Sequence, residues 1–515
     1  MTLLSRKRRR AGISQAWNSS RKLQFRAPMQ LRPFLALSVS NMPKASSKPF
    51  RFCSTLEKFG VVVVFGAFVG ACGANSLEHP GLSDGAVLAC PARGSLVWPS
   101  VADMSVCQTY PSAQVKGVAV SPAGEIYLTG NYSGTADFVS TKLPDPLSTP
   151  ALNPNQDPHY KGALFVAKLA ADGAPMWAGA FAGIAASLAL DHAGRPSLSA
   201  TESAAHSGSG AGTVRQLDPA TGTVRWEHKL TWADASDGLG FPYFMACAAG
   251  EQTSVILPGR LLKLDGNGNV ALDVAIAPLP ATGELGHPDG LSESENGDLL
   301  FHDWGWSRPE DPTTWPRPKY GRLTSFDATG KVRWTQVIEG RDYGNLPQLA
   351  ADHEGRLALF GDARGFSGIP GGATFDSSSY GLGYLGIMDR DGHALVQRNL
   401  DPPTPSSGVW RGGELTLASF GLTQESEMSL SVFSASGDLT QSTTLVLVPN
   451  GFLNDESVSY GYLAAQGADL IFAGTRETYT HCVCEEALLC AQSRPYVIRI
   501  NSDGSRDATF CEFLP

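Results

Sequence analysis

The sequence predicts an all-β fold made by repeating one four-stranded unit. A Gly is followed four residues later by a Trp at Gly94–Trp98, Gly173–Trp177, Gly222–Trp226 and Gly330–Trp334, whereas 10 Trp and 56 Gly in 515 residues give about one such pair by chance. In the last three pairs an alternating apolar run ends just before the Gly and another begins after it, as in a β-hairpin. The 56 Gly, 34 Pro and 17% charged residues also suit short strands joined by turns.

Each repeat contains two strand pairs. The first pair is clearest at 115–130, where two apolar runs flank a turn with Gly124. The second pair is clearest at 164–181, where apolar residues alternate with a period of two before the turn at Gly173. One repeat therefore supplies four antiparallel strands.

Turn glycines trace the repeat through the chain. The first pairs turn at Gly124, Gly194, Gly250, Gly297, Gly355, Gly413 and Gly467, and the second pairs at Gly173, Gly222, Gly268, Gly330, Gly392, Gly437 and Gly504. Seven interleaved units of four strands predict a seven-bladed β-propeller over residues 109–515. The third and sixth copies are degenerate, so six or eight blades stay open.

The segment 115–183 resembles the SBBP repeat of bacterial extracytoplasmic seven-bladed propellers. The resemblance rests on IYLTGNYSGTADF followed by LFVAKLAADGAPMWAGAFAG, and the turn-and-Trp part recurs at 217–226 and 326–334. It implies an exported propeller and supplies no catalytic residues. The bland interpretation of Trp177, Trp226 and Trp334 is that they fill gaps between neighbouring blades, with each indole N–H finding a partner.

Residues 42–71 predict a lipoprotein signal peptide. A basic stretch precedes the apolar run 61–69, which is too short for a bilayer span of roughly 20 residues. Val69-Gly70-Ala71-Cys72 resembles the bacterial lipobox, and this predicts acylation of Cys72, attachment to the membrane and export. Gly73 is not the Asp that retains enteric lipoproteins at the inner membrane, so the outer membrane is expected in a Gram-negative host.

The Arg- and Lys-rich residues 1–41 make an oversized start for such a signal. We interpret them as upstream sequence wrongly joined to the frame, with Met42 as the start. A long basic n-region or a nucleic-acid arm is the alternative. The net charge of −9 argues against nucleic acid as the main partner of the mature chain.

Residues 72–108 are interpreted as a lipidated tether that also contains a ring-closing strand, RGSLVW at 93–98. We expect this strand to lie on the blade that ends near residue 510. Up to three disulfides are expected among the cysteines that flank the repeats, which are Cys90, Cys107, Cys482, Cys484, Cys490 and Cys511. Their pairing cannot be deduced from the sequence, but a bond between the two terminal groups would lock the ring. Cys247 is expected to be free and buried.

One segment departs from the repeat. Residues 301–321, FHDWGWSRPEDPTTWPRPKYG, are interpreted as a loop in the fourth unit, and exposed aromatics beside carboxylates suit sugar rings. The alternative is a Pro-stiffened loop whose Trp side chains pack on their own blade. The candidate ligand-binding residues are Asp303, Trp304, Trp306, Glu310, Asp311 and Trp315.

Three turns contain alternating oxygen ligands that could suit a cation: LDGNGNV after Leu264, MDRDGH after Ile387 and NSDGSRD from Asn501. None has the downstream Glu that completes a Ca²⁺ loop, and Asn, Asp and Gly are also hairpin-turn residues. The turn interpretation is preferred, and no metal or cofactor is predicted.

Two functions follow. The first is a lipid-anchored scaffold that binds a protein or polysaccharide at the cell envelope. The alternative is an envelope polysaccharide hydrolase or lyase with carboxylates on the propeller face. The sequence contains no nucleophile elbow, zinc-protease or Walker motif. The GTVRW and GKVRW pieces also resemble the Trp motifs of quinone-dependent dehydrogenase propellers, but no cofactor cage is identified. Catalytic residues are therefore not assigned.

Overall fold

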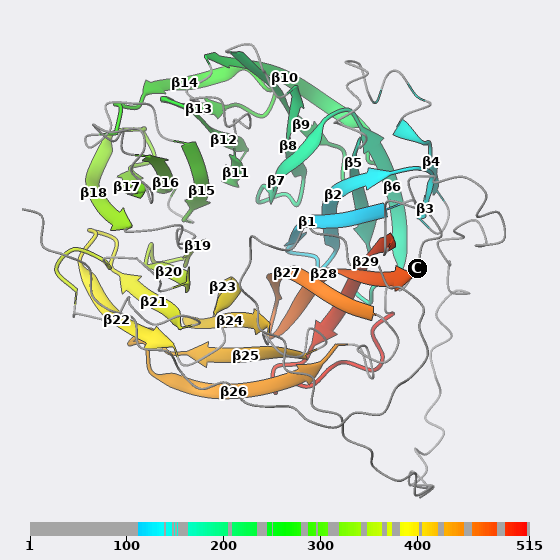
Figure 1. Ribbon diagram of the computed structural model, residues 1–515. Helices are drawn as coiled ribbons and strands as arrows, with labels where there is room; N and C mark the ends of the chain where they lie inside the picture. The colour runs from blue at the N-terminus through cyan, green and yellow to red at the C-terminus, as the bar shows by residue number, and fades with distance from the viewer. Residues whose placement is uncertain are drawn as a thin grey trace, which may run out of the picture. The chain divides into compact units, whose positions relative to one another are not determined.

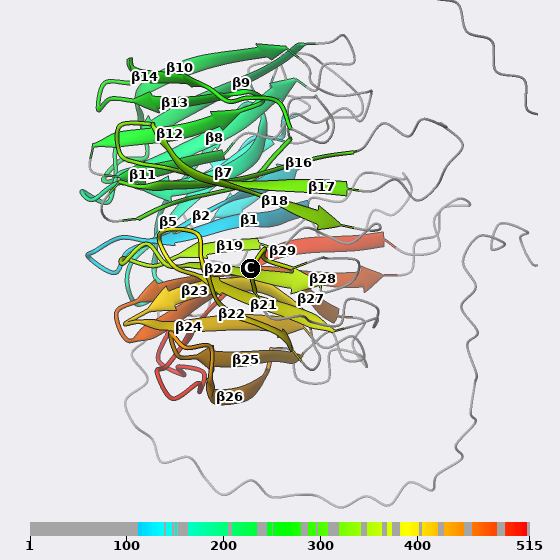
Figure 2. The same ribbon diagram turned by 90° about the vertical axis from the view of Figure 1, so that its left-hand side faces the viewer.

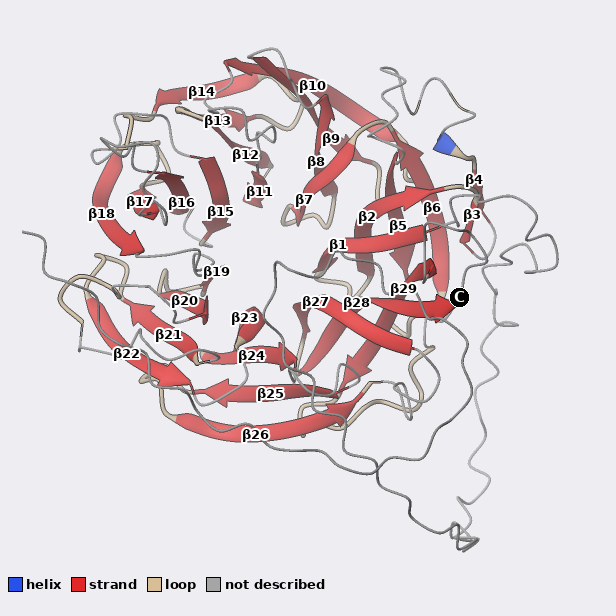
Figure 3. Ribbon diagram, viewed as in Figure 1, coloured by secondary structure: helices blue, strands red, loops and turns tan. Residues whose placement is uncertain are grey.

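The computed structural model contains a ring of seven β-sheets (Figure 1). It describes residues 112–511, with the exception of 139–140, 147–148, 150–151, 153–162, 204–208, 234–244, 250, 280–286, 295–296, 307–318, 341–347, 363–367, 373–381, 401–403, 421–426, 448–455 and 481–489. Strands make up almost all of its regular structure (Figure 3). Among these residues no helix is long and apolar enough to cross a membrane.

Blades 1 to 4 are antiparallel sheets with strands in chain order from the centre outward (Figure 1). Blade 1 is β1 (Ser112–Val120), β2 (Ile126–Ser133), β5 (Ala163–Leu169) and β6 (Pro175–Phe181); blade 2 is β7 (Ile184–Leu190), β8 (Pro196–Ser203), β9 (Ser209–Leu217) and β10 (Val224–Ala233); blade 3 is β11 (Met245–Ala249), β12 (Gln252–Leu257), β13 (Arg260–Leu264) and β14 (Val270–Ala275); blade 4 is β15 (His287–Glu293), β16 (Leu299–Trp306), β17 (Lys319–Phe326) and β18 (Val332–Gly340).

The remaining blades continue the ring. Blade 5 is β19 (Gln348–Ala351), β20 (Leu357–Asp362), β21 (Gly383–Met388) and β22 (Ala394–Leu400); blade 6 is β23 (Pro405–Arg411), β24 (Glu414–Phe420), β25 (Glu427–Phe433) and β26 (Leu439–Val446); blade 7 is β27 (Glu456–Gln466), β28 (Asp469–Thr480) and β29 (Cys490–Ile500). A small hairpin, β3 (Ala136–Phe138) with β4 (Thr141–Leu143), follows β2.

The innermost strands close the circle. Each first strand contacts the first strand of the next blade, and β27 contacts β1. The seven-bladed prediction is therefore confirmed, and the six- and eight-bladed alternatives are wrong. The third and sixth units are complete four-stranded sheets despite their degenerate sequences.

The turn glycines explain this regularity. Thirteen of the fourteen predicted glycines have a positive φ in the structure, and the other, Gly250, lies outside the described residues. In the turn at Gly330 the Asp327 N–H donates to the Lys331 carbonyl at 2.9 Å, and the Gly330 N–H donates to the Asp327 carbonyl at 2.9 Å. This geometry requires a left-handed residue at the fourth position, and glycine adopts that conformation without a steric cost.

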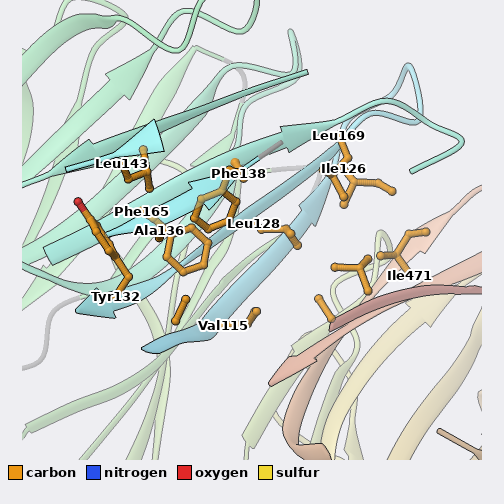
Figure 4. Close-up of a cluster of buried hydrophobic side chains, with 14 of the residues drawn as sticks. Val115, Ile126, Leu128, Tyr132, Ala136, Phe138, Leu143, Phe165, Leu169 and Ile471 are labelled. Carbon is orange, nitrogen blue, oxygen red and sulfur yellow. The ribbon is translucent and has the colours of Figure 1, made fainter. Parts of the chain in front are cut away.

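The hydrophobic core is divided among the blade interfaces. Buried apolar side chains of the described residues form seven clusters, one between each pair of neighbouring blades. The cluster between blades 7 and 1 joins Val115 and Phe165 to Ile471, and Phe138 and Leu143 of the small hairpin extend it (Figure 4). Because both faces of a blade are covered, the middle strands are apolar on both sides.

The predicted packing role of the tryptophans is confirmed. A Cβ added at Gly222 would lie 2.7 Å from the Trp177 ring, so the indole of one blade lies on the turn glycine of the next. Trp226 lies on Gly268 and Trp334 on Gly392 in the same way. The Trp177 indole N–H donates to the Pro219 carbonyl at 3.1 Å and that of Trp334 to the Arg390 carbonyl at 2.9 Å. We call this contact the latch.

Blade 7 differs from the other six. It has three strands among the described residues, because the chain leaves β29 after the turn at Gly504. Only Arg506, bridged to Ile500, and Asp507, whose N–H donates to the Arg499 carbonyl, begin a fourth strand. Phe510 then packs against Gly173 of blade 1 and makes the seventh latch. The segment 93–98 lies outside the described residues, so its pairing stays a prediction, but Trp98 cannot also occupy the place that Phe510 fills.

Candidate functional site

The two faces of the ring are built differently. Since the strands alternate in direction, the first-to-second and third-to-fourth turns all lie on one face, which we call the turn face (Figure 2). The other connections join strand ends on the opposite face, which we call the loop face. The connections 307–318, 363–382 and 481–489 attach there. Propellers carry variation in such connections because the sheets beneath do not depend on them.

The turn face is made of turns whose side chains cap their own backbone. The Asp265 carboxylate accepts the N–H groups of Asn267 and Asn269, both at 2.9 Å. The Asp389 carboxylate accepts those of Asp391 at 2.9 Å and His393 at 2.8 Å. These backbone bonds, that from Asn269 first, lower the pKa of Asp265. The hairpin interpretation of the alternating turns is therefore confirmed.

A charge network on the turn face was not predicted. Asp298 accepts hydrogen bonds from Arg333 at 2.7 Å and Arg390 at 2.5 Å, and Arg333 also reaches Asp391 at 2.9 Å. The network ties blade 4 to blade 5 beside a cavity of about 20 Å³, which is enough for about one water. Only Asp298 and Asp391 next to turn glycines hinted at it in the sequence. Its size and its complete pairing indicate a structural role.

Blade 4 changes the interpretation of the aromatic segment. Residues 301–306 belong to β16 and 319–321 to β17, so the prediction of a loop over all of 301–321 is wrong, and only 307–318 connects the strands. The extended alternation of the apolar run at 299–301 simply continues through the polar residues after it. Glu310, Asp311 and Trp315 lie outside the described residues.

Asp303 and Trp304 point to opposite sides of blade 4, because neighbouring strand residues alternate. Phe301, two residues before Asp303, packs in the cluster with Ile256 of blade 3. Leu300 packs in the cluster with Leu359 of blade 5, and Trp304 and Trp306 share its side of the strand. The structure thus groups the two tryptophans and separates Asp303 from them.

Asp303 is part of a buried ion pair. Its side chain is 2% exposed and accepts Arg322 Nε at 3.0 Å and Nη2 at 2.5 Å. Arg322 Nη1 also donates to the Ala277 carbonyl at 2.6 Å, which anchors the chain that leaves blade 3. Burial raises the pKa of Asp303, and the bonds from Arg322 oppose this. Asp303 therefore holds two blades together in this structure.

Trp304 is the candidate residue best placed for a ligand. It is half-buried near the loop-face end of β16 and lies opposite Gly321, which has no side chain to cover its ring. Trp306 ends the strand two residues further on, and its side chain is outside the described residues. Two aromatic residues on one side of a strand at a face edge can offer flat surfaces to a ring or an extended chain.

The described carboxylates do not form a catalytic pair. The buried aspartates Asp191, Asp298, Asp303 and Asp352 each accept hydrogen bonds from an arginine. Within these same residues no group of three His, Cys, Asp or Glu side chains is placed to hold a metal ion.

The cysteines are distributed over both faces. Cys490 begins β29 at the loop face, and Cys482 and Cys484 lie in the connection before it, outside the described residues. Cys511 is at the turn face, where its N–H donates to the Asp172 carbonyl at 2.8 Å, and it is disulfide-bonded. Cys72, Cys90 and Cys107 precede the described residues. Cys247 lies in β11, and its side chain is not described.

No protein-family model matches the chain, and no curated protein matches it. The solved structures that resemble it are propellers or proteins without a stated function. The β-propeller domain of the Trilobed protease from Pyrococcus furiosus, which has an open velcro topology, is 8% identical with a TM-score of 0.40, covering 78% of this chain and 98% of that one. A Bacteroides caccae protein of unknown function is 14% identical with a TM-score of 0.30, covering 56% and 82%. An uncharacterized Listeria monocytogenes protein is 9% identical with a TM-score of 0.35, covering 70% and 91%.

Proposed function

We propose that this chain is an exported, lipid-anchored β-propeller that binds a polysaccharide or protein at the bacterial cell envelope through the loop face of blade 4. The observation that carries the proposal is the difference between the faces. The turn face consists of short turns that satisfy their own hydrogen bonds, whereas the half-buried Trp304 lies at the loop face, where the longer connections attach. The resemblance to SBBP repeats and the lipobox at Cys72 support the exported setting.

A glycan array tests the binding part. The wild-type chain, Trp304→Ala and Trp306→Ala are compared with Trp334→Ala, a matched control in the same blade whose ring lies at the turn face. Loss of a stacking aromatic weakens binding about 10-fold or more, while the control keeps the affinity of its folded fraction. Equal binding by all four proteins removes the blade 4 tryptophans from the proposal.

The anchor is tested separately. Acyl labelling of the chain in a bacterial host is expected in the wild type and is lost in Cys72→Ser, which moves the protein to the soluble fraction. Labelling that persists in Cys72→Ser contradicts the lipobox.

The alternative of a polysaccharide hydrolase or lyase needs two carboxylates about 5–10 Å apart and facing a substrate. The buried aspartates of the described residues are held by arginines, so no described pair supports it. Release of reducing ends or unsaturated products from an array-positive polysaccharide would support the alternative.

A further inference from the structure

The open edge of β29 is the starting point. In blades 1 to 6 the third strand pairs with a fourth, as β17 does with β18 along its whole length. In blade 7 the tail pairs only near Ile500 and Arg499 and then crosses to Asp172 of blade 1. Among the described residues, the part of β29 from Cys490 to Ile498 has a partner only on its β28 side. Unpaired edges of this length are avoided in soluble proteins.

We infer that residues 93–98 form the missing outer strand of blade 7, antiparallel to β29, and that Cys90 is the disulfide partner of Cys511. The strand then runs from the turn face to the loop face. The remaining segment 99–111 returns to Ser112, where β1 begins at the loop face. Other connections from a fourth strand to the next blade, such as 234–244 and 276–286, are of similar length.

The two faces exclude most other partners for Cys511. Cys490 is separated from Ile500 by the length of β29, about 33 Å, and Cys482 and Cys484 lie in the connection at the far end. Disulfide Cα atoms lie within about 7 Å of each other. Cys247 lies in an inner strand of blade 3, with blade 2 between it and blade 1.

Cys107 is excluded by chain length. It precedes Ser112 by five residues, which span at most about 18 Å. β1 then runs about 26 Å to Val120 at the turn face, and Cys511 lies beyond that level, beside the turn of Asp172 and Gly173. Cys90 has no such limit, because 93–98 itself would span the blade. Cys107 is left at the loop face with Cys490.

The bond forms by thiol–disulfide exchange in the export compartment. The Cys90 and Cys511 thiols are oxidised to one disulfide, while the disulfide of an exported oxidoreductase is reduced to two thiols, so two electrons and two hydrogens pass to that protein. The result covalently fastens the first strand of the ring to its last segment.

Tryptic mapping of the full, unreduced chain tests the pairing directly, because cleavage separates the cysteines by face. Cys90 lies in a peptide ending at Arg93, Cys107 in 94–116, the 482–490 group in 477–499 and Cys511 in 507–515. We expect the peptide ending at Arg93 to be linked to 507–515, and 94–116 to 477–499. A link of 507–515 to 94–116 or 477–499, or Cys511 as a free thiol, overturns the inference.

Two further variants keep the test independent of folding losses. Cys90→Ser is expected to leave Cys511 open to a thiol-specific tag, while the matched control Cys107→Ser places the new tag in 477–499. For the strand, adjacent N–H groups point to opposite sides, so one of Leu96→Pro and Val97→Pro must break the ladder. Hydrogen exchange in 490–498 rises several-fold in that variant; equal exchange in both variants and the wild type overturns the strand pairing.

Discussion

The latches of blades 1, 2 and 4 use tryptophan, whereas those of blades 3, 5 and 6 use other residues at the same position. Leu272 lies on Gly330, Val396 on Gly437 and Gln441 near Gly504, each four residues after its own turn glycine. Gln441 Nε2 donates to the Asp503 carbonyl at 2.8 Å, much as the indoles donate in their latches. The glycine that receives the latch is constant and the residue that supplies it varies, so the backbone turn is the conserved element of the repeat within this chain.

The largest expected effect tests the glycine side of the latch. Gly222→Ala places a Cβ against Trp177 at a φ of 71°, and we expect a loss of about 3 kcal/mol in the free energy of unfolding. Gly371→Ala is the control, since it has a φ of 79° and open space, and should lose about 1 kcal/mol. Denaturant unfolding followed by circular dichroism measures both. Equal losses would show that the turn, and not the latch, needs glycine.

The next effect compares a Trp latch with an aliphatic one. Trp177→Ala removes a half-buried ring and its N–H bond to Pro219, at a cost of about 2–3 kcal/mol. Val396→Ala in blade 5 removes less surface and should cost about 1 kcal/mol. The same unfolding measurement applies. A larger loss for Val396→Ala would mean that the Trp latches are not the stronger ones.

A smaller loss is expected at the polar latch. Gln441→Ala removes one hydrogen bond to the turn of blade 7, worth about 1 kcal/mol. Gln441→Leu should recover part of this through apolar contact with that turn. Thermal unfolding of the three proteins orders them as wild type, Gln441→Leu, Gln441→Ala, and the reverse order of the two variants would show that the polar bond is not the useful part.

The smallest effect concerns the turns themselves and depends on pH. The pKa of Asp265 is lowered by its backbone hydrogen bonds, so its contribution is present above the unfolded pKa of about 3.9 and is lost as the pH falls through the folded pKa. Asp265→Asn should therefore lower the melting temperature slightly at pH 6 and make almost no difference at pH 3. A difference that grows on acidification would contradict the assigned hydrogen bonds.

The sequence by itself determined the repeat. Turn glycines that must adopt positive φ and strands that alternate with period two are local requirements, so the blade count could be read without a structure. The degenerate third and sixth blades could still be counted because their turn residues were kept. The packing role of Trp177 also followed from its position alone.

Only the tertiary structure decided what the candidate residues contact. Asp303 and Trp304 are neighbours in the sequence, yet one is sealed in an ion pair with Arg322 toward blade 3 and the other lies on the blade 5 side. Arg322 and Ala277, which fix Asp303, are distant in sequence, and no local pattern announces them. The division of the cysteines between faces likewise depends on strand direction in three dimensions, because the sequence gives spacing along the chain but not the face at which each segment ends.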